Sequence, residues 1–309
     1  MPRPEPPPSA SRRADLLTPE QLIGLGGLEV LTRSVVEGFM MGLHRSPHRG
    51  FSAEFAELRG YRPGDDLRHI DWRMFARSDR YYVKQFEEET NLRAYLLLDV
   101  SASMDWSSRP GVLPTKLWYG RLLTAALGLL LIRQGDRVGL AIFDEEIRAW
   151  LPDRGGQRQW RELARTLMEA ESRGTTDPTM ALRRTALRLR RRGLVILVSD
   201  LLVDPEETLR SLEFLRHRGH QVMVFHLLDP GEREIEGVGE VLFKDPETGE
   251  ELRVDVQEMR SVYREAVGRA VEEWRRALAP SGIEYHLVDT GEPLSRGLRW
   301  ALTRRSRLG

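Results

Sequence analysis

Ala94-Tyr95-Leu96-Leu97-Leu98-Asp99 is an unbroken apolar run that closes on a carboxylate, and it sets the class of fold. Such a run, bounded by polar residues, is typical of a parallel strand buried on both faces. Similar runs follow at 138–143 (VGLAIF), 194–199 (LVILVS), 222–228 and 284–288. We therefore expect a sheet built on several buried strands.

Helical patterns separate these runs, which predicts an α/β fold with a doubly wound, mostly parallel sheet of the Rossmann type. A shorter strand at 147–151 is expected to form an antiparallel edge. A hairpin around Thr248-Gly249 is expected as an insertion near 232–255. The predicted helices cover residues 115–134, 157–170, 179–191, 205–217 and 256–278.

The N-terminal third has a different composition. Residues 1–15 are rich in Pro, Ser and Arg, which predicts a disordered tail. Thr18-Pro19-Glu20 is a helix start signal, with an N-cap, a proline at the first position and an acidic first turn. We expect residues 16–92 to form this helix and a strand-containing accessory lobe, and residues 93–309 to form the doubly wound domain.

Composition excludes several classes of function. Lys plus Arg and Asp plus Glu both number 47, so the chain lacks the basic excess of a general nucleic-acid binder. It has no cysteine, which excludes disulfides, zinc thiolates and a thiol nucleophile. The longest apolar run, 122–132, is too short to span a bilayer, so we expect a cytoplasmic protein. Neither a phosphate-binding glycine loop nor a Gly-x-Ser-x-Gly elbow is present.

Hard oxygen ligands gather where the predicted strands end. Asp99, Ser101 and Ser103 follow the first buried strand, and Asp200 follows the run LVILVS. The carboxyl ends of parallel strands form the ligand-binding edge of an open sheet. Hydroxyl and carboxylate oxygens suit Mg²⁺, with Mn²⁺ or Ca²⁺ as alternatives. The Asp-x-Ser-x-Ser spacing alone is a weak signal, because Ser and Asp also cap helices and make turns.

With these pieces in order, residues 94–289 resemble a von Willebrand factor A domain with a metal-ion-dependent adhesion site. The resemblance adds Thr176 as a ligand, from Gly174-Thr175-Thr176-Asp177, although Thr175 is the alternative. It implies that the serines and the threonine bind the ion directly, and that the aspartates act through water or change their role with conformational state. The full set is then Asp99, Ser101, Ser103, Thr176 and Asp200.

A second resemblance lies in the N-terminal lobe. The stretch from Glu57 to Arg77, which includes Pro63-Gly64-Asp65-Asp66 and Ile70-Asp71-Trp72-Arg73, is similar to a bacterial family called domain of unknown function fifty-eight, and residues 83–87 extend the likeness. The family implies a MoxR-type AAA+ ATPase as partner and a chaperone-like or assembly role.

The leading hypothesis is a non-enzymatic, metal-dependent interaction module whose bound ion takes an acidic side chain from a protein partner. A metal-dependent phosphoesterase or nuclease is the first alternative. It would use Asp99 and Asp200, with Asp65 or Asp71 as further carboxylates. A scaffold whose metal site has decayed is the second.

Overall fold

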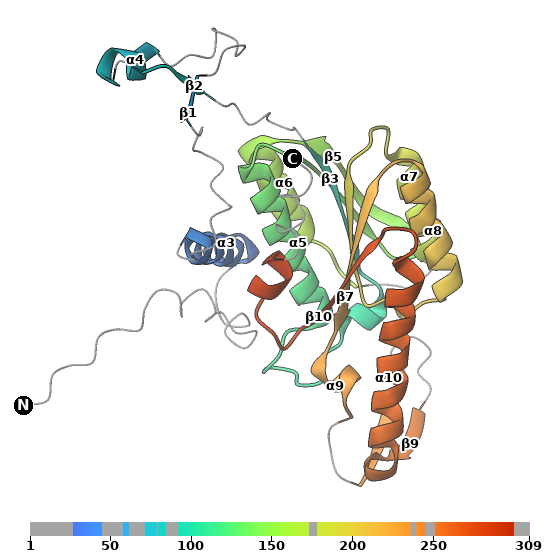
Figure 1. The fold of residues 1–309 in the computed structure, drawn as a ribbon. Coiled ribbons are helices and arrows are strands. Elements are labelled where there is room, and N and C mark those ends of the chain that lie inside the picture. The colour runs from blue at the N-terminus through green and yellow to red at the C-terminus, as the bar shows by residue number, and fades with distance from the viewer. Residues whose placement is uncertain are drawn as a thin grey trace, which may run out of the picture.

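The computed structural model describes residues 27–44, 58–61, 72–78, 80–84, 92–172, 178–235, 239–244 and 251–299. Its centre is a six-stranded sheet in the order β10-β7-β6-β3-β4-β5 (Figure 1). All neighbours are parallel except β4 and β5, which pair antiparallel. The strands are β3 (Arg93–Asp99), β4 (Arg137–Phe143), β5 (Ile147–Arg154), β6 (Leu194–Ser199), β7 (Gln221–Leu228) and β10 (Glu284–Asp289).

Helices cover both faces of this sheet, which confirms the predicted doubly wound α/β class. Alternate residues of β3 point into two separate cores. Leu96 and Leu98 pack with the helices of one face, whereas Tyr95 and Leu97 pack with those of the other. The first face carries α5 (Lys116–Arg133) and α6 (Gly156–Met168), and the second carries α7 (Pro178–Arg188), α8 (Pro205–His217) and α10 (Val256–Leu278).

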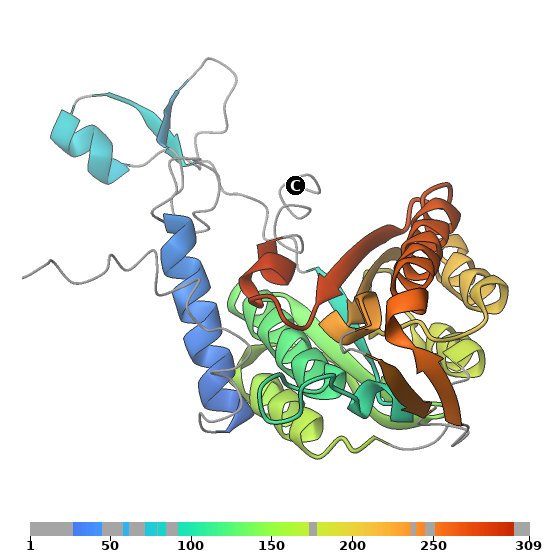
Figure 2. The ribbon, with the colours of Figure 1, turned by 90° about the horizontal axis from the view of Figure 1, so that it is seen from below.

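The helix α5 is buried nearly all round because a further helix covers its outer side. Thr115 caps its N-terminus by accepting a hydrogen bond from the backbone N–H of Trp118. The covering helix is α3 (Leu28–His44), which packs against α5 and α6 (Figure 2) and adds Leu31, Val36 and Phe39 to the same core. The predicted helix start at Thr18 and the tail at 1–15 lie outside the described residues, and the boundary at residue 92 stays a prediction.

Two small antiparallel strand pairs also lie in the described part of the chain. The first joins β1 (Leu58–Gly60) to β2 (Tyr82–Lys84), beside α4 (Trp72–Ser78), in the predicted lobe. The second joins β8 (Glu240–Lys244) to β9 (Glu251–Asp255), which is the expected hairpin before α10. Its predicted turn at Thr248-Gly249 lies outside the described residues.

Two element boundaries differ from the prediction. The helix expected at 179–191 ends at Arg188. Residues 189–193 are needed to connect it to strand β6, which begins at Leu194, so the three arginines at 190–192 lie in this connection and not in the helix. The edge strand expected at 147–151 continues to Arg154, where it still pairs with Val138. No helix in the described part of the chain is both long and apolar enough to cross a bilayer.

Candidate metal centre

The candidate site lies at the carboxyl ends of β3 and β6. These adjacent strands mark the point where the chain reverses its direction of winding. From β3 the sheet extends to one side through β4 and then β5, and to the other side through β6, then β7 and then β10. Open α/β sheets bind ligands at this switch point, because the loops that follow the two strands diverge there. The sheet therefore brings Asp99 and Asp200, which are about a hundred residues apart in sequence, to one edge.

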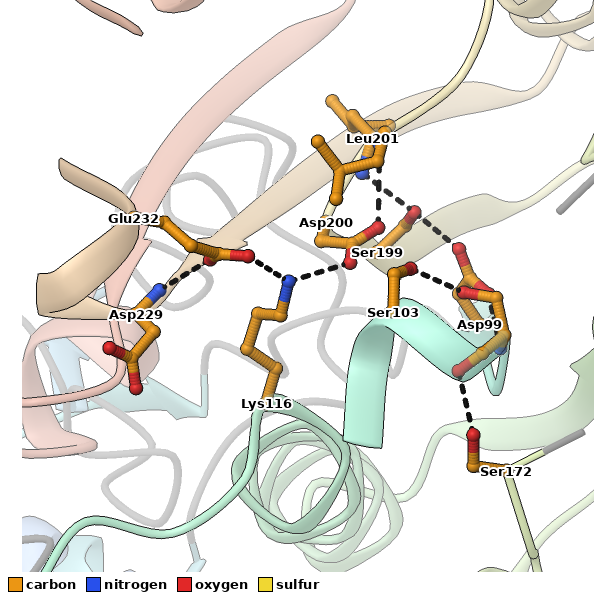
Figure 3. A network of polar contacts seen from close by, with 11 residues as sticks. Asp99, Ser103, Lys116, Ser172, Ser199, Asp200, Leu201, Asp229 and Glu232 are labelled. Carbon is orange, nitrogen blue, oxygen red and sulfur yellow. Dashed lines mark hydrogen bonds and ion pairs between the residues drawn. The ribbon is translucent and has the colours of Figure 1, made fainter. Parts of the chain in front are cut away.

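Asp99 is the last residue of β3, and it is fully buried. Its Oδ1 accepts a hydrogen bond from the backbone N–H of Ser101, at 2.9 Å. Its Oδ2 accepts one from the hydroxyl of Ser199, the last residue of β6, at 2.6 Å. The Ser199 oxygen in turn accepts from the backbone N–H of Leu201 at 3.0 Å. The carboxylate is thus held in place by both strand ends (Figure 3).

The two predicted serine ligands are buried next to one another. Ser101 precedes a short 3₁₀ helix, η2 (Ala102–Asp105), which carries Ser103. The turn brings the two Oγ atoms to 3.1 Å. Ser172 donates a hydrogen bond to the carbonyl of Ser101 at 2.9 Å, so the loop after α6 also reaches this site.

Asp200 follows β6 and is also fully buried. Its Oδ2 lies 2.8 Å from the Nζ atom of Lys116, and its Oδ1 accepts from the backbone N–H of Leu202 at 3.4 Å. The next residue, Leu201, has a left-handed backbone with φ 51°, which is costly for a leucine. Strain of this kind is held by its surroundings and is frequent at functional sites.

Burial of two carboxylates near one another dominates the electrostatics. Burial and, after it, the negative charge of Asp200 raise the pKa of Asp99 to about 7, although hydrogen bonds from Ser199 and Ser101 act to lower it. Burial lowers the pKa of Lys116, but Asp200 and Glu232 more than offset this, so the ammonium stays charged. A cation near Asp99 would replace the proton that this carboxyl otherwise holds.

These residues fit a divalent cation. Octahedral coordination of Mg²⁺ with bonds of about 2.1 Å places adjacent ligands about 3 Å apart, which matches the separation of the Ser101 and Ser103 hydroxyls. Asp99 and Asp200 supply hard anionic oxygens beside them. Within the described residues, no group of three or more His, Cys, Asp or Glu side chains could hold a metal, so the hydroxyls are essential to such a site.

Four of the five predicted ligands therefore lie at one edge of the sheet, and the fifth is not described. Thr176 and its alternative Thr175 lie outside the described residues, as do Asp65 and Asp71, the extra carboxylates of the hydrolase alternative. The metal assignment itself stays a prediction.

Sequence reasoning missed three residues of the site: Ser199, Lys116 and Glu232. Ser199 could have been found, because it is a polar residue in an otherwise apolar buried strand. Glu232 had a weaker signal, since Asp229-Pro230-Gly231-Glu232 has the spacing of a capping box. Lys116 had none, because a lysine at the start of a helix is ordinarily exposed.

A family model described as protein of unknown function DUF58 matches residues 57–273. The chain belongs to this family. This confirms the resemblance of the motifs at 57–77 and 83–87. Similar curated proteins include the uncharacterized protein Rv1480 of Mycobacterium tuberculosis and Mb1516 of Mycobacterium bovis. Each is 28% identical over 275 residues, which is 85% of this chain and 85% of theirs.

Solved structures similar to this DUF58 chain include the conserved hypothetical protein BatB from Bacteroides thetaiotaomicron. It has a TM-score of 0.48 and 17% identity, and the match covers 70% of this chain and 99% of that one. The VWA domain of SpRpn10 has a TM-score of 0.41 and 12% identity, with coverage of 67% and 93%.

Proposed function

We propose that this DUF58 protein is a non-enzymatic, cation-dependent protein-interaction module. Asp99, Ser101, Ser103 and Asp200 would hold Mg²⁺, with Thr176 as a further ligand, and an acidic side chain of the partner would complete the coordination. The convergence of two buried hydroxyls and two buried carboxylates at the switch point supports this most directly. The two hydroxyls are neutral and Asp200 is already paired with Lys116, so a divalent ion would keep positive charge that an external carboxylate would offset.

The partner that the family resemblance favours is a MoxR-type AAA+ ATPase, in a chaperone-like or complex-assembly role. An interaction of this kind predicts that capture of the ATPase depends on the cation site and not merely on a folded domain. Chelation alone cannot test this, because an AAA+ ATPase uses Mg²⁺ with its own nucleotide. The test therefore has to change the site and keep Mg²⁺ constant.

We would immobilise the wild-type chain, an Asp99→Asn variant and a Ser101→Ala/Ser103→Ala variant, and measure capture of the MoxR-type ATPase encoded in the same genome. Ser281→Ala is a matched control, since Ser281 bonds Glu213 away from the strand ends of the site. Both site variants should lose capture while the control retains it. Equal capture by all four proteins would contradict a cation-bridged interface.

The phosphoesterase alternative has less support among the described residues. A two-metal hydrolase holds its ions with several shared carboxylates. Here Lys116, a cation, occupies one side of Asp200. Release of phosphate from a phosphoester by the wild type, abolished in Asp99→Asn, would favour the enzyme instead.

A further inference from the structure

Lys116 is buried at the edge of the candidate metal site. It is the first residue of α5, and its side chain has no exposed surface. Its Nζ atom forms ion pairs with Asp200 and with Glu232 (Figure 3). Because removing a lysine from water is costly, its presence here needs two anionic partners at fixed positions.

Glu232 is held rigidly enough to fix the lysine. It lies in α9 (Pro230–Arg233), where its Oε2 accepts from the backbone N–H of Asp229 at 2.9 Å in a capping box. The carboxylate of Asp229 accepts from Gly231 and from the backbone N–H of Ser108. The packing there is close, since a Cβ at Gly231 would come within 2.3 Å of the Ser108 Cβ. These contacts place the Glu232 carboxylate where it holds the Lys116 ammonium beside Asp200.

The lysine changes the charge that a bound cation would meet. Without it, a divalent ion would face the two carboxylates of Asp99 and Asp200, which could neutralise it. When Lys116 is present, its ammonium offsets the charge of Asp200. Asp99 is then the one carboxylate beside the two neutral hydroxyls whose charge no lysine offsets. Interactions of this kind are strong at short range in a buried site.

We propose that Lys116 is a built-in counter-ion that weakens the site's own hold on the divalent cation and so leaves positive charge for an anionic group of a partner. This rests on the proposed function and adds the residue that tunes it. A purely structural lysine would behave differently, because removing either member of its ion pair with Glu232 would then disturb the site and weaken cation binding in the same direction.

The test measures binding of Mn²⁺ alone, from the electron paramagnetic resonance signal of the free ion. Lys116→Met should bind Mn²⁺ about 10-fold more tightly than wild type, because a positive charge next to Asp200 is removed. Glu232→Gln should bind it several-fold more weakly, because the whole charge of Lys116 then acts on Asp200. Lys116→Arg keeps the charge and should remain near wild type.

Tighter Mn²⁺ binding by Lys116→Met together with weaker binding by Glu232→Gln supports the counter-ion role of Lys116. Binding by Lys116→Met that is equal to or weaker than that of wild type overturns it. If Lys116→Met does not fold, Lys116→Met/Glu232→Gln removes both buried charges and should still bind more tightly. If that also fails to fold, Glu232→Gln decides: unchanged or tighter binding overturns the proposal. Wild type that binds no Mn²⁺ while Lys116→Met does would contradict the proposed function but support the counter-ion. Binding by neither contradicts both.

Discussion

Asp99→Asn should remove the loss of stability that ionisation of Asp99 causes in the cation-free protein as the pH rises. The pKa of Asp99 is raised from 3.8 to about 7, first by burial and then by Asp200. Its folded pKa therefore exceeds its unfolded pKa, and the folded state binds the extra proton. The stability that this proton confers is complete below about pH 4 and is lost as the pH rises through 7.

The size of this effect follows from the shift. Each pKa unit corresponds to about 1.36 kcal/mol, so ionising Asp99 inside the fold should cost roughly 4 kcal/mol between acid and pH 8. Asparagine carries no charge, and its side-chain oxygen can still accept the hydrogen bond from the Ser101 N–H. The variant should therefore be more stable than wild type at pH 8 in EDTA, and this difference should shrink as the pH is lowered to 5.

The assay is urea unfolding followed by circular dichroism at pH 5, 6.5 and 8, with EDTA or with Mg²⁺. Added Mg²⁺ should stabilise wild type most at pH 8, because the ion replaces the proton. Asp144→Asn is the matched control. Asp144 is also a buried aspartate and follows the neighbouring strand β4, but its carboxylate pairs with Arg148 and not with the candidate metal site. If wild type and Asp99→Asn lose stability in parallel between pH 5 and 8, the assigned electrostatics are wrong.

Two further predictions concern the strands that carry the site. Gly193→Ala should lower the free energy of unfolding by about 2 kcal/mol or more, because the new Cβ would lie 2.3 Å from the carbonyl oxygen of Arg93 in β3. As a control in α10, Gly268→Ala should raise the free energy of unfolding by about 0.5–1 kcal/mol in the same urea experiment, because its Cβ would meet no atom within 4 Å. Leu201→Gly should be about 1 kcal/mol more stable than Leu201→Ala, because glycine relieves the left-handed backbone, although both lose a buried side chain. Thermal unfolding that ranks alanine above glycine at residue 201 would contradict this backbone strain.

The sheet could be predicted from sequence because its information is local. Each central strand is a continuous apolar run, and the pattern of β3 alone specifies burial on two faces. The carboxyl-end positions of Asp99 and Asp200 then follow from topology. The hairpin could also be predicted, since its two strands flank a Thr-Gly turn signal.

The charge network could not be predicted in this way. Lys116 meets Glu232, 116 residues later, only because α9 folds against the loop that precedes α5. Nothing in the immediate neighbourhood of Lys116 marks it as buried. The covering of α5 by α3 is likewise a tertiary fact, although the apolar character of α5 on every side called for such a cover. Local patterns therefore indicate where the candidate site lies, and long-range packing determines its charge.

The most direct test of the account is calorimetric titration of Mg²⁺ into the wild-type chain and into Ser101→Ala/Ser103→Ala at pH 8. We expect one Mg²⁺ per wild-type chain and no binding to the double variant, whose fold should persist because the Asp99 carboxylate keeps its hydrogen bonds from the Ser101 N–H and the Ser199 hydroxyl. Absence of Mg²⁺ binding to wild type, or equal binding to both proteins, would contradict a cation site at the ends of β3 and β6.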